Sequence, residues 1–309
     1  MVEKYVQSIF NLPHSISAKG PRKRSSRWQH VIGIVGGMGP YAHIELERQL
    51  LLATAEMLSH PPRDQDYPAW RLSSFPATPD RTRALLGVGR SPVPWLERSV
   101  RSLAAGRRGV RADFVVMACI TAHAFLEDVQ RQVSIPVLDM VDETLRDALS
   151  NQSPTRIGLL ATTGTLQSDI YQAAADRVGS GVRIVSLLDV EDRGRPGEWL
   201  QEHLVMEPVY GPLRRAARTG GGLKSGALTG APAREAAARF SEAVSILARG
   251  GAELVILGCT EIPVVLGEGE IEGVGLLDPL AVTARAAIEI ASGARPLPSV
   301  ALSGVGVGA

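Results

Sequence analysis

The stretch VIGIVGGMGPYAHIELERQL, residues 31–50, decides the fold. A short β-branched run leads into a glycine turn, and apolar residues then recur at helical spacing. A strand, a glycine-rich turn and a helix form the opening of a βα unit in a parallel sheet. The sequence therefore predicts an α/β fold, with a helix over 41–58. The candidates for one broad buried face of this helix are Ile44, Leu46, Leu50, Leu51 and Ala55.

The same pattern occurs a second time. RIGLLATTGTLQSDIYQAAADRV (156–178) again has a strand, a turn with Gly and a helix. GAELVILGCTEIP (251–263) likewise matches RADFVVMACITAH (111–123), in which we expect a buried strand over 112–120. Internal similarity of this kind indicates a duplicated unit. We therefore expect two pseudo-symmetric, doubly wound parallel-sheet domains, with the active site in the cleft between them.

The polar, turn-prone stretch SNQSPT (150–155) separates the two halves. The predicted organisation is a basic, flexible N-terminal arm at 1–30, a first α/β domain at 31–150 that also takes up a helix at about 277–293, a second α/β domain at 151–276, and a loose tail at 294–309.

Two segments allow alternative interpretations. The basic arm contains SAKGPRKRSSR (17–27) and is predicted to be solvated, with a phosphate-binding or partner-docking arm as the alternative. The stretch ARTGGGLKSGALTGAPAREA (217–236) includes a glycine-rich part at 219–231. Its composition favours a mobile loop between helices, with a lid over a site as the alternative.

The composition excludes several classes of protein. The net charge of the 309 residues is +1 and no apolar run is long enough to cross a membrane, so we expect neither a nucleic-acid partner nor a membrane. The N-terminus lacks a continuous apolar signal core. Two cysteines are too few for a disulfide framework in a chain of this length. The cytoplasm is therefore the expected compartment.

Cys119 and Cys259 are both expected at the carboxyl ends of strands, where ligands bind in open α/β sheets. Thr121 and Thr260 follow them as polar residues that start a helix. The dipole and free N–H groups of a helix N-terminus favour a thiolate. The alternatives are two small core residues or a disulfide between the domains. Two cysteines alone cannot form the usual four-ligand structural zinc site.

Two thiols that face each other across a cleft suit one specific reaction. One thiolate takes a proton from one face of a carbon atom, and the other thiol returns a proton to the opposite face. This inverts a stereocentre and needs no metal or cofactor. Because the α-proton of an amino acid is weakly acidic, the site must also hold the carboxylate with many hydrogen-bond donors.

Several motifs match a known family as a set. They are GIVGGMGP (33–40), RDQDYP (63–68), PDRT (79–82), CITAHAF (119–125), SIPVLDMVD (134–142), GLLATTGTLQSDIYQ (158–172), VYGPLR (209–214) and LGCTEIPVVL (257–266). They occur in the family's order over about 31–290, and with them the chain resembles the aspartate/glutamate racemase superfamily, most closely its aspartate-racemase-like branch. Members of that branch are cofactor-independent and contain two similar α/β domains with one cysteine from each.

The resemblance implies a PLP-independent racemase or epimerase for aspartate, glutamate or a related acidic amino acid, and a homodimer. Cys119 and Cys259 are implied as the acid/base thiols. The implied substrate contacts are Thr121, Thr162, Thr260 and the backbone of Gly37 and Met38 for the carboxylate and ammonium groups, Arg81 for the side-chain carboxylate, and Arg214 in the position of a family lysine.

Two further residues keep alternatives open. His123 tunes the Cys119 thiol, or is a buried structural histidine. Glu261 orients the site as a candidate substrate-binding residue, or caps the following helix.

Ile120 departs from the family, because members commonly have asparagine at this position. As a candidate substrate-binding residue it offers only apolar surface, so one hydrogen-bond donor is missing if it faces the substrate. The alternative function is therefore a same-fold isomerase, decarboxylase or lyase on a related carboxylic acid in a specialised biosynthetic pathway. It would use one cysteine as nucleophile or proton donor.

Overall fold

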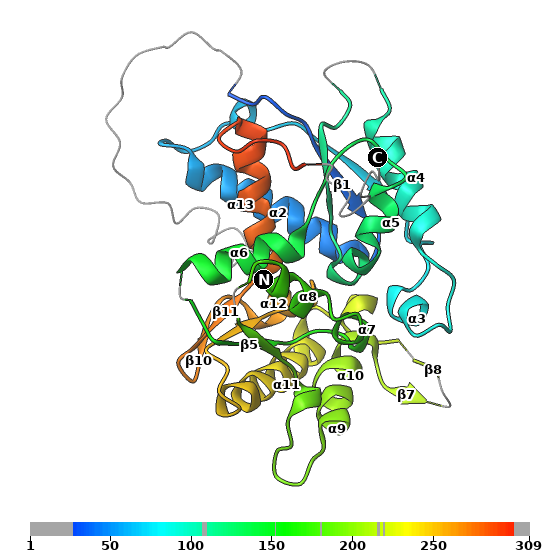
Figure 1. Ribbon diagram of the computed structural model, residues 1–309, viewed down its shortest axis with the longest axis vertical. Coiled ribbons are helices and arrows are strands. Elements are labelled where there is room, and N and C mark those ends of the chain that lie inside the picture. The colour runs from blue at the N-terminus through cyan, green and yellow to red at the C-terminus, as the bar shows by residue number, and fades with distance from the viewer. Residues whose placement is uncertain are drawn as a thin grey trace, which may run out of the picture.

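The computed structural model of the protein describes residues 27–106, 110–151, 153–179, 181–214, 217–218 and 220–299. Most of the predicted basic arm and the end of the predicted tail lie outside these residues. The described chain forms two main sheets, each with helices on its faces. Figure 1 shows them as an upper half around β1 and a lower half around β5.

Four parallel strands form the first sheet. In spatial order they are β2 (Trp70–Ser74), β1 (Ile32–Gly36), β3 (Phe114–Met117) and β4 (Val137–Leu138). β1 and β3 are buried along their whole length, as expected for β-branched runs in the middle of a parallel sheet.

The second sheet repeats this order. From one edge it contains β6 (Arg183–Val185), β5 (Arg156–Leu159), β9 (Leu254–Ile256) and β11 (Val274–Leu277), all parallel, followed by the antiparallel edge strand β10 (Gly269–Ile271). In both sheets the first strand of the half lies between the second and the third. The predicted α/β fold of two related parallel sheets is thus confirmed. A separate antiparallel pair joins β7 (Leu213–Arg214) to β8 (Ala217–Arg218).

A glycine at the same place in each half explains the repeated Ile-Gly pattern. A Cβ added to Gly33 in β1 would lie 2.9 Å from the Ala112 side chain and 3.0 Å from that of Val115. A Cβ added to Gly158 in β5 would lie 2.9 Å from Val255 and 3.2 Å from Ala252. Both glycines therefore make room for side chains at equivalent positions of the neighbouring strand.

Helices connect the strands on both faces of each sheet. Those of the first half are α2 (Pro40–Met57), η1 (Asp64–Asp66), α3 (Arg81–Leu85), α4 (Val93–Ala104), η2 (Ile120–Phe125), α5 (Leu126–Gln130) and α6 (Met140–Asn151). Those that follow are α7 (Thr163–Gln167), α8 (Ile170–Arg177), η3 (Leu187–Asp189), α9 (Gly197–Gln201), the π-helix η4 (Glu202–Met206), α10 (Glu207–Tyr210), η5 (Leu223–Ser225), α11 (Gly230–Arg249), α12 (Ile262–Leu266) and α13 (Pro279–Ser292).

The predicted buried face of α2 is only partly right. Leu46 and Leu50 are fully buried, but Ile44 is 52% exposed and Leu51 is 39% exposed. The face that packs inward is rotated relative to the predicted one and also takes in polar residues such as Gln49. Polar side chains at these positions hid the true helical face in the sequence.

α13 follows the second sheet in the chain but packs on α2 and α6 of the first half. Figure 1 shows it beside α2. The segments next to it are also attached: the backbone N–H groups of Gln29 and His30 donate to the Ala291 carbonyl, and the Arg295 guanidinium binds both carboxylate oxygens of Glu143 at 2.7 and 2.8 Å. Ordered structure therefore extends beyond the predicted limits of the arm and the tail.

One apolar core joins the two halves. It contains Ile34 from β1 and Val116 from β3 together with Ile157 from β5 and Ile256 from β9. Because the two sheets share one core, packing within that core fixes their relative position, and they are not joined only by a flexible linker.

The glycine-rich segment is more structured than expected. Residues 217–236 were predicted to be a mobile loop, but η5 lies within them and α11 already begins at Gly230. Between these elements Gly222 packs tightly, because an added Cβ would lie 2.5 Å from the Gly211 nitrogen and 2.6 Å from the Val209 carbonyl oxygen. Backbone packing of this kind holds η5 against the end of α10.

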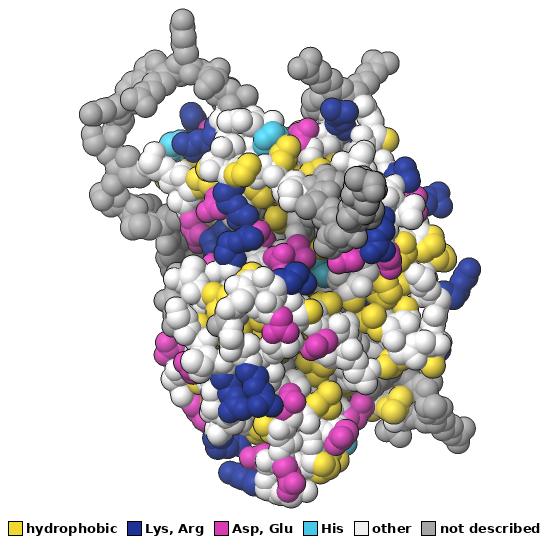
Figure 2. Space-filling model, in the orientation of Figure 1, with side chains coloured by type: hydrophobic (Ala, Val, Ile, Leu, Met, Phe, Trp, Pro, Cys, Tyr) yellow, Lys and Arg dark blue, Asp and Glu magenta, His cyan; other side chains and the backbone are white. Residues whose placement is uncertain are grey.

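Surface charges are mixed on the face drawn in Figure 2. Basic side chains gather in one small cluster on the lower half and are otherwise interspersed with acidic ones. None of the helices in the described part of the chain is long and apolar enough to cross a membrane.

Candidate active site

The two cysteines line one cavity between the halves. Cys119 follows β3 and Cys259 follows β9, which are the equivalent third strands of the two sheets. Both thiols are 5% exposed, and the cavity that they line is narrow. The first half contributes Arg81, Cys119, Ile120 and Thr121 to the lining. The second half contributes Thr162, Tyr210, Lys224, Gly258, Cys259 and Thr260.

Tight turns bring the two thiols into the cavity. The Cys119 N–H donates to the Met117 carbonyl at 2.8 Å, and the Gly258 N–H donates to the Ile256 carbonyl at 3.0 Å. Each turn ends its strand and redirects the chain. This is why β3 stops at Met117, although the apolar sequence predicted a strand to residue 120.

The helix dipole contributes less than expected. The element after Cys119 is the six-residue 3₁₀-helix η2, and the one after Cys259 is the five-residue α12. The macrodipole acts through aligned peptides and is weak in such short helices. The charge state of Cys259 is therefore set mainly by burial and by neighbouring side chains.

Cys259 lies beside a buried ion pair that sequence reasoning missed. The Cys259 Sγ donates to Glu261 Oε2 at 3.1 Å, and Lys224 Nζ donates to Glu261 Oε1 at 2.7 Å. Burial raises the pKa of the Cys259 thiol well above its ordinary value, the negative charge of Glu261 raises it further, and Lys224 opposes this. The surroundings thus favour the protonated thiol.

The side chain of Glu261 does not cap α12, so the alternative that it orients the site stays a prediction. It occupies the N-cap position of α12, but its side chain makes no capping bond. Instead it accepts hydrogen bonds from Lys224, Cys259 and Thr260, the last at 3.2 Å, and is 1% exposed. Although burial acts in the opposite direction, attraction to Lys224 and these hydrogen bonds lower the pKa of the Glu261 carboxyl.

Cys119 has a cation as its charged neighbour. Arg81 is 8% exposed, and its guanidinium donates to the Met38 carbonyl at 2.8 Å and to the Pro79 carbonyl at 3.1 Å. Burial alone would lower the pKa of Arg81, but attraction to Cys119 and Tyr210 raises it. Its Nε atom is buried and has no hydrogen-bond partner among the described residues. Arg81 is therefore a buried cation of the cavity wall and not a surface residue.

Three threonines form a hydroxyl cluster, of which Thr121 and Thr162 line the cavity. Thr121 Oγ1 lies 2.8 Å from Thr165 Oγ1 and 3.4 Å from Thr162 Oγ1, and the last two are 3.3 Å apart. Thr121 and Thr162 were predicted, whereas Thr165 was not. A hydroxyl donates and accepts, so the cluster can reorient its protons toward a carboxylate.

Gly37 and Met38 support the site from behind, and neither lines the cavity. The Gly37 N–H donates to His43 Nδ1 at 3.3 Å, and the φ angle of Gly37 is +87°. The side chain of Met38 is buried in the core, while its carbonyl holds Arg81. Contacts of their backbone with the substrate stay a prediction.

His123 contacts the backbone of Cys119 and not its thiol. Its Nδ1 lies 3.0 Å from the Cys119 carbonyl oxygen, and its Nε2 accepts the Met140 N–H at 3.2 Å. Because Nε2 accepts, Nδ1 carries the proton and donates to Cys119. The ring therefore ties the end of β3 to the start of α6, as the structural alternative for His123 predicts.

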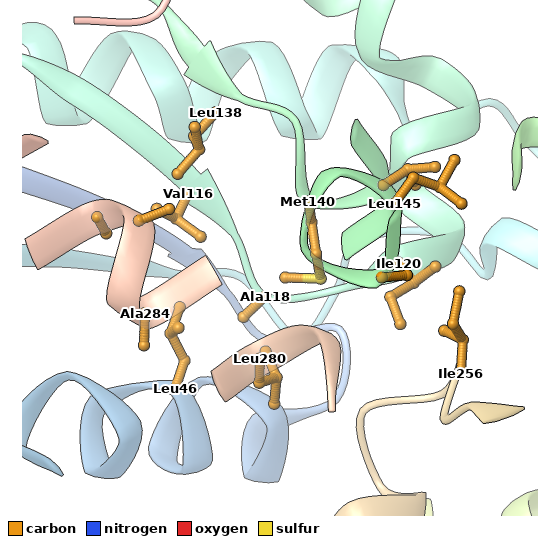
Figure 3. Close-up of a cluster of buried hydrophobic side chains, with 14 of the residues drawn as sticks. Leu46, Val116, Ala118, Ile120, Leu138, Met140, Leu145, Ile256, Leu280 and Ala284 are labelled. Carbon is orange, nitrogen blue, oxygen red and sulfur yellow. The ribbon is translucent and has the colours of Figure 1, made fainter. Parts of the chain in front are cut away.

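Ile120 is part of the core that joins the halves. It is 2% exposed and belongs to the same apolar cluster as Met140, Leu145 and Ile256. Figure 3 shows its side chain between Leu145 of α6 and Ile256 of β9, with Met140 nearby. Ile120 borders the cavity, but most of its surface packs against apolar neighbours from both halves.

Three residues that line the cavity were not identified from the sequence, namely Lys224, Tyr210 and Gly258. The side chain of the predicted Arg214 lies outside the described residues. Lys224 supplies a cation from η5 and lies 5.7 Å from the centre of the Tyr210 ring. A single lysine in the glycine-rich LKSG stretch was the available signal for it. Among the described residues, no group of three or more His, Cys, Asp or Glu side chains is arranged to hold a metal ion.

Comparisons with known proteins identify the family. The sequence profile of the Asp/Glu/hydantoin racemase family matches residues 35–207, which is more than half of the chain. The chain belongs to this family. It is 26% identical over 176 residues to the glutamate racemase of Aquifex aeolicus, covering 56% of each protein. It is 27% identical over 155 residues to RacX of Bacillus subtilis, a broad specificity amino-acid racemase, covering 50% of this chain and 63% of RacX.

A solved structure shows the same fold. The aspartate racemase of Picrophilus torridus superposes with a TM-score of 0.64 at 21% identity, and the match covers 86% of this chain and 95% of that one. The chain spans less than two thirds of the length of the two curated relatives. The membership and the fold of the Asp/Glu/hydantoin racemase family are thus established for this protein.

Proposed function

We propose that the protein is a racemase or epimerase for an acidic amino acid, with Cys119 and Cys259 as the two acid/base groups. The observation that carries this proposal is the shared cavity: thiols from equivalent strands of the two halves line the same small space. One thiolate removes the α-proton, and the opposite thiol delivers a proton to the other face of the carbon. The Cα–H bond that breaks on one face is replaced by one on the other.

The remaining lining supports a dicarboxylic substrate. Arg81 is a buried cation with an unpartnered Nε, which suits a carboxylate of the substrate side chain. The hydroxyls of Thr121 and Thr162 suit the α-carboxylate, and Thr165 hydrogen-bonds to both. Fixed donors at this carboxylate stabilise the charge that develops when the α-proton leaves. The proposed chemistry uses only these side chains and requires neither a metal nor a cofactor.

The test is α-proton exchange. Each of D- and L-aspartate and D- and L-glutamate is incubated with the purified protein in D₂O and followed by proton NMR. We expect the α-proton signal to disappear, and we expect Cys119→Ser and Cys259→Ser to abolish the exchange. A matched control is Ser168→Ala, which removes a hydroxyl bonded within α7 and away from the lining.

Two outcomes contradict the proposal. If none of the four amino acids exchanges its α-proton, the protein is not a racemase for them. If one of them is consumed with loss of CO₂ or with formation of a double bond, the alternative decarboxylase or lyase activity of the same fold applies.

A further inference from the structure

The two thiols have neighbours of opposite charge. Cys259 donates to a carboxylate oxygen of Glu261 at 3.1 Å, and Glu261 is almost fully buried. Among the described side chains that line the cavity, the charged groups that act on Cys119 are the cations Arg81 and Lys224. The site is thus symmetric in its backbone but asymmetric in its charges.

Glu261 is held in its ionised form. Lys224 Nζ donates to one of its oxygens at 2.7 Å, and Thr260 Oγ1 donates to the other at 3.2 Å. An ionised carboxylate accepts hydrogen bonds and cannot donate them, so the hydrogen between Cys259 and Glu261 belongs to the sulfur. If Cys259 were ionised as well, two negative charges would lie 3.1 Å apart in a buried position.

The balance of buried charge gives the state of the other thiol. Arg81 and Lys224 contribute two positive charges, and Glu261 contributes one negative charge. Asp80 also acts on Arg81, but it is partly exposed and therefore screened by solvent. Among the buried groups, a thiolate at Cys119 makes the site neutral, whereas a thiol there leaves one positive charge without a buried counter-charge. Burying a charge without a partner is unfavourable, so the neutral arrangement is favoured.

Resting on the two-thiol function above, we propose that the substrate-free enzyme carries the transferable proton on Cys259 and presents Cys119 as the base. Glu261 is the positioning residue that fixes this assignment, and Lys224 keeps Glu261 ionised. In one turnover the Cα–H bond breaks toward the Cys119 sulfur, and the S–H bond of Cys259 breaks toward the opposite face of the carbon. Cys119 then holds a proton, and a Cys259 thiolate lies beside Glu261.

The enzyme must therefore reset after each turnover, because the proton has to return from Cys119 to Cys259. The two enantiomers meet different forms of the enzyme. D and L isomers have equal free energies, so kcat/KM is equal in both directions. We expect kcat to differ between the two enantiomers and KM to differ by the same factor.

The first test measures which sulfur is ionised in the absence of substrate. The ultraviolet absorbance of thiolates is recorded at neutral pH for the wild type, Cys119→Ser and Cys259→Ser. We expect the thiolate signal to persist in Cys259→Ser and to be lost in Cys119→Ser. A thiolate signal in Cys119→Ser but not in Cys259→Ser would overturn the assignment. A thiolate signal of similar size in both variants, or no thiolate signal in the wild type, would overturn it as well.

The second test addresses Glu261. Folded protein is alkylated with iodoacetamide, and the extent of reaction at each cysteine is measured by peptide mass spectrometry. Glu261→Gln keeps the size and an acceptor oxygen but removes the charge. We expect the reactivity of Cys259 relative to Cys119 to rise about tenfold or more, which is the effect of one unit of pKa.

The control is Glu268→Gln, which makes the same change at an exposed position. A loosened structure would raise the reactivity of both cysteines and leave their ratio unchanged, and that result would refute the role of Glu261. Neither measurement needs turnover. Absence of α-proton exchange with a thiolate at Cys119 would refute the racemase function alone, and exchange with a thiolate at Cys259 would refute the assignment alone.

Discussion

Ile120 combines a place at the cavity with a place in the core that joins the halves. Its neighbours Met140, Leu145 and Ile256 are apolar and come from both halves. An amide at this position would have to leave its hydrogen-bonding groups unsatisfied in the core or turn toward the cavity. The replacement of the family asparagine by Ile120 therefore affects the stability of the fold as well as the contact with the substrate.

At this position we predict that Ile120→Asn lowers the free energy of unfolding by about 3–5 kcal/mol, because it creates a cavity and buries an unpaired amide. Ile120→Val is the matched variant and should cost only about 0.5–1.5 kcal/mol. Denaturant unfolding followed by circular dichroism measures both. Equal losses for the two variants would show that the site tolerates a polar group.

At the scale of single residues, the sequence predicts those site residues that lie within or next to a recognisable sequence motif. Cys119, Cys259 and Thr121 are found at the cavity because they directly follow or lie next to strand ends. Tyr210 of α10 and Lys224 of η5 reach the cavity from the long connection between β6 and β9. Their position depends on tertiary packing, such as that of Gly222 on the end of α10. No local pattern in the sequence encodes that packing.

Asp278 is the N-cap of α13, and its carboxyl group is buried. Its Oδ1 accepts the Leu280 N–H at 2.8 Å, while its Oδ2 has no hydrogen-bond partner among the described residues. Burial raises the pKa of this carboxyl to about 7, and the charges of Glu45 and Glu268 act in the same direction, although the bond from Leu280 opposes them. A helix that joins the two halves therefore begins at a group that titrates near neutral pH.

The stability of the protein should depend on the charge of this cap. The unfolded-state pKa of an aspartate is about 3.9, so between that pH and about 7 the folded state holds a proton that the unfolded chain releases. The resulting stabilisation is complete below the unfolded pKa and is lost as the pH rises through about 7.

We predict that Asp278→Asn, which keeps the acceptor oxygen without the charge, is less sensitive to pH than the wild type. Between about pH 5 and pH 8 the wild type should lose roughly 1–3 kcal/mol more than the variant. Urea unfolding at a series of pH values measures the difference. Asp169→Asn, at an exposed position, is the control and should follow the wild type. Parallel curves for wild type and Asp278→Asn would contradict the prediction.

At the scale of elements, the existence of helices and strands was more predictable than their ends or faces. α2 occupies 40–57 where 41–58 was expected, because its apolar spacing is continuous. β3 is shorter than its apolar run because a turn at Cys119 ends it. The start of α11 inside the glycine-rich stretch was not predicted, since a run of Gly and Ala with prolines does not resemble a helix start without its tertiary contacts.

The two halves also meet at a contact close to the site. α3 of the first half packs on α7 of the second, and a Cβ added to Gly164 of α7 would lie 2.6 Å from Thr82 Oγ1 and 2.7 Å from Thr82 Cα. Thr82 is the neighbour of Arg81. The position of this arginine in the cavity therefore depends on how closely the halves approach.

We predict that Gly164→Ala forces the halves apart at this point and destabilises the protein by about 1–3 kcal/mol, as overpacking does. It should also weaken binding through Arg81, seen as a higher KM. Gly275→Ala in β11 is the matched control, because an added Cβ there comes no closer than 3.4 Å to its nearest neighbour, Leu254. Thermal unfolding of both variants is the measurement, and an identical melting temperature for them would contradict the predicted clash.

At the scale of the whole molecule, the repeat of the Ile-Gly strand and of the cysteine strand predicted two related sheets correctly. The halves share a single core through Ile157, Ile256 and the β1–β3 region, which the sequence pattern of separate βα units does not reveal. Homodimer formation, implied by the family resemblance, stays a prediction. Analytical ultracentrifugation measures it directly.

A ribosome makes α13 only after the whole second sheet, although α13 packs on α2 and α6. From the end of α6 at residue 151 to the end of α13 at residue 292, synthesis takes roughly 7 to 28 s at the usual rates of elongation. During that interval the first half displays the apolar surfaces that α13 will later cover. We therefore expect the nascent chain to be more prone to aggregation, and to bind chaperones more readily, until its last helix has left the ribosome.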